Sequence, residues 1–168
     1  MTFIDEQTIN SAIEKLHSTP QDDLPELFTG IGDSQPALLG YLMDYSDTFD
    51  DMDSKNSLIY MFAIIVLSFE MRGITVPVTP EEIEAEQEKQ MNDLAGLEGK
   101  TDAELEELVH AITFSQPVLF DFIKDQLLSQ AEETGVEDEQ KMASTFAVLK
   151  LVVDVMTNTF NSRVPGMN

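Results

Sequence analysis

Two histidines each follow a glutamate by three residues, giving the pairs Glu14/His17 and Glu107/His110. Residues i and i+3 of an α-helix lie on the same side, so each pair presents a carboxylate and an imidazole together. Di-iron carboxylate bundles use two such pairs plus one carboxylate from each of two other helices. A di-iron carboxylate bundle is therefore one alternative function, and its candidate ligands are Glu14, His17, Glu70, Glu107, His110 and Asp154.

The two pairs do not occupy equivalent places in the chain. An internal repeat with an offset of 81 residues, described below, aligns His110 with Thr29 rather than with His17. The first pair also ends a short helical segment, whereas a di-iron bundle needs four long helices facing one another. We therefore expect no metal and no cofactor, and keep the di-iron protein as an alternative.

A cluster of aspartates suggests calcium but does not fit a calcium-binding loop. An EF-hand loop has Gly at its sixth position and Glu at its twelfth. Counted from Asp51, these positions hold Asn56 and Phe62. We therefore expect a solvated acidic loop, which contains Asp44, Asp47, Asp50, Asp51 and Asp53.

The sequence offers no recognisable catalytic nucleophile. It has no Cys, no Gly-x-Ser-x-Gly turn and no Gly-rich phosphate-binding loop. Carboxylates are so abundant that their spacing alone nominates no acid–base pair. We predict no catalytic residue; enzymatic activity is left open, and a non-enzymatic protein is favoured.

Acidic residues dominate the charge: 32 Asp plus Glu stand against nine Lys plus Arg, a formal net charge of −23. Such a surface repels nucleic-acid phosphates and anionic membranes, so neither is an expected partner. It attracts basic proteins and speeds encounter with them. We therefore predict a basic protein partner, and nucleic-acid mimicry is the sharpest form of this prediction. The rival interpretation is that the acids only keep the protein soluble.

The densest acid lies between Glu81 and Glu107, where eleven acidic residues accompany two lysines. Like charges at i and i+4, such as Glu84 and Glu88, destabilise a helix by about 0.2–0.5 kcal/mol per pair. The apolar stripe is thin in this stretch, so selection for stability alone does not explain the acids. The predicted partner-binding residues are Glu81, Glu82, Glu84, Glu86 and Glu88.

The elements that carry these residues occur twice. Ser34-Gln35-Pro36 returns as Ser115-Gln116-Pro117, and the neighbouring apolar positions match at the same offset of 81 residues. Ser and Pro are typical of helix starts, so we predict that Ser34 and Ser115 cap helices. The two copies span approximately residues 1–73 and 79–163, joined by an extended linker at 74–78.

Apolar residues recur at helical spacing, and no strand-like alternation bounded by turn signals is present. The predicted fold class is all-α, in a single domain over residues 1–168. It is a helical bundle or short helical array built from two tandem copies of a four-helix unit of about eighty residues. Segment 54–71 is apolar in nearly every direction, so we expect it in the core or in an oligomer interface. Gly30 and Gly32 are expected to punctuate the chain before Ser34.

The N-terminus lacks the basic and apolar regions of a signal peptide, and the longest apolar run, 58–69, is short for a bilayer. We therefore expect a cytoplasmic protein. The leading prediction is a non-enzymatic acidic helical interaction protein: an adaptor, an inhibitor or a small chaperone for a basic partner. The alternatives are the di-iron protein and a ligand-free oligomerisation module, with a homodimer as the simplest oligomer.

Overall fold

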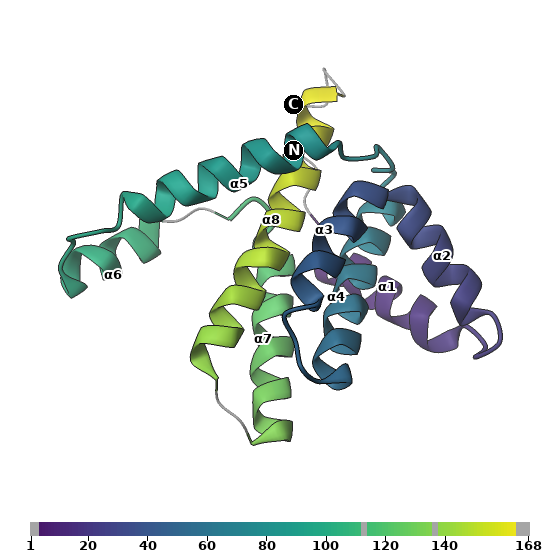
Figure 1. Cartoon of the computed structure of the whole chain (residues 1–168). Helices are drawn as coiled ribbons and strands as arrows, with labels where there is room; N and C mark the ends of the chain where they lie inside the picture. Colours follow the sequence, from purple (N-terminus) through teal and green to yellow (C-terminus); the bar gives the residue numbers. More distant parts are fainter. Residues whose placement is uncertain (1–3, 112–113, 136–137, 164–168) are drawn as a thin grey trace.

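The computed structural model describes residues 4–111, 114–135 and 138–163, except the side chains of residues 106, 108–111 and 134. Within these ranges the chain is all-helical (Figure 1), which confirms the predicted class. The helices are α1 (Glu6–Ser18), α2 (Leu24–Ser34), α3 (Pro36–Ser46), α4 (Met52–Met71), α5 (Pro80–Ala95), α6 (Asp102–Ala111), α7 (Pro117–Thr134) and α8 (Glu139–Arg163).

Helix α4 lies in the core, as its sequence predicted. Every side chain from Met61 to Phe69 is buried, including Ser68, whose hydroxyl donates to the Ile64 carbonyl at 2.7 Å. Helices α1, α2 and α3 pack on α4, α5 and α7 pack on α8, and α4 contacts α8. The two long helices therefore form the centre against which the other helices are assembled.

Helices α4 and α8 are each long and apolar enough to cross a bilayer, although the uninterrupted apolar run in the sequence is short. In the structure, 61% of the apolar window of α4 and 67% of that of α8 are buried inside the bundle. Their apolar character is thus used in packing against neighbouring helices. The cytoplasmic location stays a prediction.

Glycine ends two of the helices where the backbone needs a left-handed residue. Gly73 follows α4 with φ of 77°, and Gly135 follows α7 with φ of 65°. Residues with a Cβ rarely adopt such values, whereas glycine does so freely. Glycine at these two positions therefore closes α4 and α7.

The predicted glycine break before Ser34 is wrong. Helix α2 continues through Gly30 and Gly32 to Ser34. A Cβ built on Gly32 would lie only 2.7 Å from Leu39 Cδ2 of α3. Gly32 therefore allows α2 and α3 to approach closely within the bundle.

The predicted serine caps are also wrong. Ser34 is the last residue of α2, and its hydroxyl donates to the Ile31 carbonyl at 2.8 Å. Ser115 donates instead to Asp154 Oδ1 on α8, at 2.7 Å. The N-cap residues of α3 and α7 are Gln35 and Gln116, and neither side chain caps its own helix.

These two glutamines turn their amides toward other parts of the chain. Gln35 Oε1 accepts from the Val78 N–H at 3.0 Å, and Gln35 Nε2 donates to the Val76 carbonyl at 2.9 Å. Gln116 Oε1 accepts from the Ile4 N–H at 2.8 Å. Both side chains are 1% exposed, so these hydrogen bonds replace water that the buried backbone groups cannot reach.

The two contacts follow one pattern. Val78 immediately precedes Thr79, the N-cap of α5, and Ile4 immediately precedes Asp5, the N-cap of α1. Each glutamine, at the start of α3 or α7, thereby holds the backbone that enters a helix far away in the sequence. The segment that the sequence predicted as an extended linker is non-helical, and Gln35 fixes its end.

Replacing either glutamine with leucine should destabilise the fold while keeping similar volume. The Val78 or Ile4 N–H would stay buried without its acceptor, at a cost of about 1–3 kcal/mol. Urea unfolding of Gln35→Leu and Gln116→Leu measures this cost, and Gln7→Leu on exposed helix surface is the control. Losses no larger than that of the control would contradict the assigned role of the amides.

Candidate interaction surface on the α5–α6 arm

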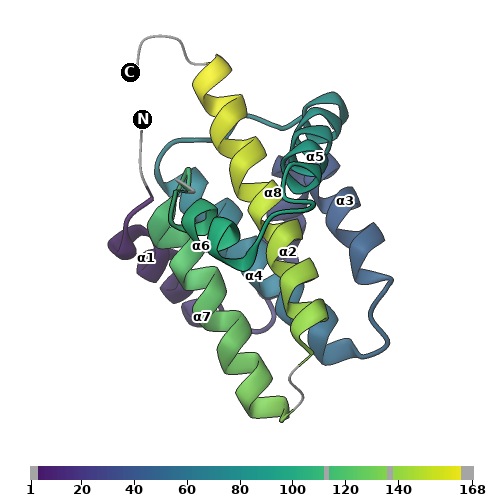
Figure 2. The same ribbon diagram turned by 90° about the vertical axis from the view of Figure 1, so that its left-hand side faces the viewer.

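Helices α5 and α6, residues 80–111, form an arm that leaves the bundle. In Figure 1 it extends to the left of α7 and α8, and in Figure 2 it points toward the viewer. Helix α5 crosses the C-terminal part of α8, and α6 lies below the outer end of α5 in Figure 1. The upper side of α5 is therefore free of other helices. Helix α5 belongs to the stretch of the sequence with the densest acidic residues.

The root of the arm is fixed by a capped helix start and an ion pair. Thr79 Oγ1 accepts from the Glu82 N–H at 3.3 Å, and Glu82 Oε2 accepts from the Thr79 N–H at 2.8 Å, forming a capping box. Arg163 Nη2 lies 2.7 Å from the same Glu82 oxygen, and Arg163 Nη1 donates to the Pro77 carbonyl at 2.9 Å. Together with Gln35, these contacts set the direction in which α5 leaves α8.

The inner face of α5 meets α8 through polar side chains. Glu86 is 7% exposed; its Oε2 accepts from Asn158 Nδ2 at 3.0 Å, and its Oε1 lies 3.6 Å from Lys89 Nζ. Gln90 Nε2 is buried with no hydrogen-bond partner among the described residues. The interface of α1 with α4 is apolar by comparison, since α1 buries Ile9, Ala12 and Leu16. Helix α5 buries one large apolar side chain, Ile83, beside Glu86, so it rests on the bundle with less apolar contact than α1.

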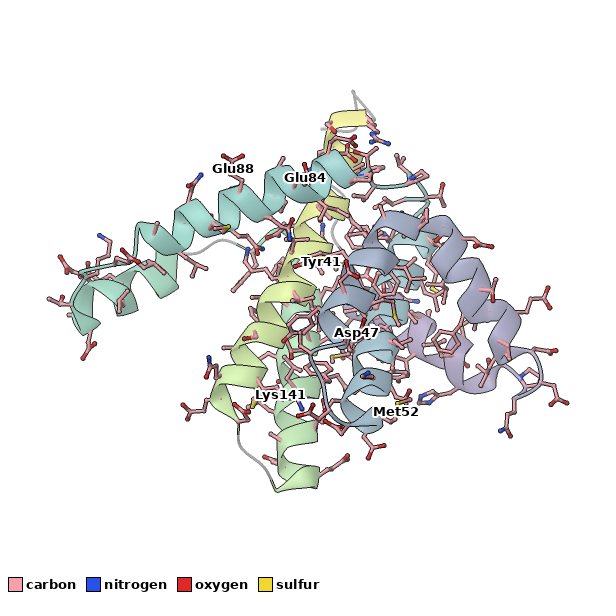
Figure 3. All side chains as sticks on the ribbon, in the orientation of Figure 1. Tyr41, Asp47, Met52, Glu84, Glu88 and Lys141 are labelled. Atoms are coloured by element: carbon pink, nitrogen blue, oxygen red, sulfur yellow. The ribbon has the colours of Figure 1, made fainter. Side chains whose placement is uncertain are left out.

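The five predicted partner-binding glutamates separate into two groups. Glu82 and Glu86 face the chain itself, where Arg163, Asn158 and Lys89 engage them, so the like-charge cost of this pair is offset. The other group is exposed to solvent and shows no ion pair within the described residues. Figure 3 shows Glu84 and Glu88 pointing up and away from the bundle. The outward acids are Glu81, Glu84 and Glu88.

Exposed apolar side chains continue the outward surface beyond the acids. Met91 is 70% exposed, Leu94 64% and Leu97 36%. Met91 and Leu94 belong to the thin apolar stripe of this stretch, and the structure places both side chains in solvent. Helical spacing gave the signal: Met91 lies seven residues after Glu84 and three after Glu88, so it shares their side of the helix.

Most cations of the protein are used within the chain. Six of the nine Lys and Arg side chains lie within 4 Å of a carboxylate among the described residues. The outward acids of the arm are therefore not neutralised by these groups. The six are Arg72, Lys89, Lys124, Lys141, Lys150 and Arg163.

The candidate di-iron ligands are distributed over several helices. His17 on α1 is exposed, and its Nε2 lies 3.1 Å from the Tyr60 hydroxyl with the two rings stacked. Asp154 on α8 is engaged by Ser115 and Lys150. Within the described side chains, no three His, Asp or Glu residues come together as a metal-binding group. Glu14 and Glu107 are exposed, Glu70 is half-buried, and the His110 side chain lies outside the described residues.

The acidic loop borders a cavity of about 260 Å³ between α4, α7 and α8. Lys141 Nζ at its mouth lies 2.8 Å from Ser54 Oγ and 3.3 Å from Asp51 Oδ2. Asp51 is the N-cap of α4, and the Ser54 N–H that donates to it is the main cause that lowers the pKa of Asp51 to about 2. The polar groups at this mouth are satisfied by one another.

Comparison with known proteins gives no relative from which a function can be transferred. No family model, curated protein or solved structure matches this chain.

The ion pair at the root of the arm should make stability depend on pH. Burial raises the pKa of Glu82, but the Thr79 N–H and the Arg163 guanidinium outweigh it and hold the pKa below the ordinary value for glutamate. A lowered carboxylate pKa stabilises the folded state at neutral pH, and this stabilisation is lost as pH falls through the lowered value. Glu82→Gln keeps a capping-box side chain but removes the charge.

We expect Glu82→Gln to cost about 0.5–1 kcal/mol at pH 7, as a partly exposed ion pair does, and less at pH 3, where protonation of the carboxylate has begun to remove the stabilisation. Urea unfolding at both pH values measures the difference from the wild-type protein. Glu81→Gln, one residue away and exposed, is the matched control. A cost for Glu82→Gln that persists unchanged at pH 3 would rule out the ion pair as its origin.

Proposed function

We propose that this protein is a non-enzymatic, acidic, helical interaction protein that binds a basic protein through the outer side of the α5–α6 arm. The observation that carries the proposal is the projection of α5, with Glu84 and Glu88 directed away from the bundle and Glu81 exposed at the start of the same helix. Glu84 and Glu88 form no ion pair within the described residues, and this like-charge pair disfavours the helix that carries it. A cationic partner would convert this repulsion into attraction.

The arrangement also supports a role as adaptor, inhibitor or chaperone more than one as an oligomerisation module. Two copies of a chain with net charge −23 repel each other when acidic surfaces meet. A basic partner has the opposite effect, and its encounter with the arm is accelerated at low salt. We therefore place the cationic partner, not a second copy, on the arm.

The proposal is tested with two variants that change the net charge equally. Glu81→Gln/Glu84→Gln/Glu88→Gln removes three charges from the arm, and Asp125→Asn/Glu132→Gln/Glu133→Gln removes three exposed charges from α7. We expect only the arm variant to lose the basic proteins that the wild-type protein retains from its host lysate at low salt. Retention by the wild-type protein should fall steeply from 0.1 M to 1 M salt, as the Debye length shrinks from ~10 Å to ~3 Å.

Two results would contradict this function. Equal loss of partner in both variants would show that binding depends on net charge and not on the arm. No retention of any basic protein by the wild-type protein, at either salt concentration, would reduce the acids to a role in solubility. Circular dichroism of both variants confirms that the helices are retained.

We infer in addition that the chain consists of two copies of one helical unit related by an internal two-fold axis. The matching sequence Ser-Gln-Pro supports this, as do the nearly equal backbone angles of the glutamines: φ is −136° in both, and ψ is 61° for Gln35 and 78° for Gln116. The reciprocal contacts support it further, since each copy's glutamine holds the entry to the other copy's first helix.

A pair of distance measurements tests the two-fold relation. Gln7 on α1 corresponds to Glu81 on α5, counting from the N-caps, and Asp44 on α3 corresponds to Asp125 on α7. The distance from residue 7 to residue 125 should therefore equal that from residue 81 to residue 44. Because the chain has no Cys, spin labels on cysteines introduced at these exposed sites report the two distances by electron paramagnetic resonance. Clearly different distances would exclude the two-fold relation.

A further inference from the structure

The outward face of α5 combines charge and apolar surface in one stripe. Residues 84, 88, 91 and 95 follow the i, i+4, i+7, i+11 spacing that places side chains on one side of an α-helix. The first two are the outward acids Glu84 and Glu88, and the third is Met91 with 70% of its surface exposed. Ala95 continues the stripe, and Leu94, 64% exposed, borders it. We call these residues the α5 stripe: Glu84, Glu88, Met91, Leu94 and Ala95.

The described part of the chain leaves this stripe uncovered. Its opposite side rests on α8 through Ile83 and Glu86, and α6 lies beneath the outer end of α5 (Figure 1). Acid occupies the N-terminal half of the stripe and apolar side chains the C-terminal half. Met91 and Leu94 are two of the three most exposed large apolar side chains among the described residues, and they follow the acids directly along the helix.

We propose that the α5 stripe receives one amphipathic helix of the basic partner, aligned along α5. Lys or Arg side chains of that helix would lie over Glu84 and Glu88, and its apolar side chains would cover Met91 and Leu94. This inference rests on the proposed function and names the form of the partner's contact. Charge complementarity favours a basic partner over a second copy of this chain, whose surface is acidic. A purely cationic groove that binds nucleic acid would offer no apolar side chains to pack against Met91 and Leu94.

The chemistry of the stripe suits this division of roles. Exposed ion pairs mainly accelerate encounter and fix orientation, so Glu84 and Glu88 should control the salt dependence of binding. Met91 is flexible and polarisable, so it can adapt to the shape of apolar partner side chains. Burial of Met91 and Leu94 should then control the lifetime of the complex.

The test uses the full-length protein and labelled helical peptides of known sequence as probes. One peptide carries Lys at i and i+4 and Leu at i+7, i+10 and i+11, and a second has the same pattern in reverse order, for antiparallel docking. A third has the same composition and charge, with the Leu residues moved to the opposite side of the helix. Fluorescence anisotropy measures each affinity at low and high salt.

We expect one of the two patterned peptides to bind at least tenfold more tightly than the third peptide. Met91→Gln/Leu94→Gln should remove that advantage but leave the salt dependence unchanged. Glu84→Gln/Glu88→Gln should instead flatten the salt dependence. Met52→Gln/Leu128→Gln, which changes two other exposed apolar side chains, is the control and should bind like the wild-type protein.

The outcomes separate this inference from the function on which it rests. Equal binding of all three peptides, lost in Glu84→Gln/Glu88→Gln, would overturn the helix-docking inference and leave an acidic surface that binds cations without pattern. Binding of none of the peptides would overturn the inference as well. In that case, retention of basic host proteins by the wild-type protein but not by the arm variant would still support the proposed function.

Discussion

The position of the arm depends on a buried side-chain amide. Gln35 holds the backbone at Val76 and Val78 with two hydrogen bonds: its amide donates to the Val76 carbonyl and accepts from the Val78 N–H. The next residue is the N-cap of α5, so this contact fixes where the helix begins. Buried backbone groups without partners are costly, and the amide supplies both a donor and an acceptor at one point. Gln116 likewise accepts a hydrogen bond from the Ile4 N–H at the entry to α1.

Beyond this root, the structure distributes its charges unevenly. Cations are few and are mainly paired with acids inside the chain, at places such as Glu82 with Arg163 and Asp51 with Lys141. The remaining acids project into solvent with little to neutralise them. A protein of this kind presents a strong negative field without exposing much positive charge that would bring two copies together. The arm concentrates that field on one helix that is held mainly at its root.

Elements with local signals could be predicted from the sequence. The capping box at Thr79, the burial of α4 and the helix ends at Gly73 and Gly135 each follow from a few neighbouring residues. The predicted cap at Ser34 was wrong because a Ser just before Gln-Pro can equally well be the last residue of the preceding helix. The repeated Gln35 was the better signal, but its partners lie more than forty residues away in the chain.

The candidate surface could be predicted only in part. The sequence located the acid on residues 81–88, but it could not separate Glu86, which α8 buries, from Glu88, which faces solvent. That separation depends on which side of α5 meets α8, and the thin apolar stripe of the helix left its rotation undetermined. The outward position of Met91 follows from the same rotation.

The contact between Ile4 and Gln116 has a consequence for the order of folding. These residues are 112 positions apart, and the Ile4 N–H, at the entry to α1, gains its hydrogen-bond acceptor only when the start of α7 is in place. Contacts of such long range form late, because chain-closure entropy is lost before they provide stabilisation. During synthesis, the N-terminal segment must therefore wait for more than two thirds of the chain to leave the ribosome. Until then Ile4, which is fully buried in the folded protein, remains outside its final environment.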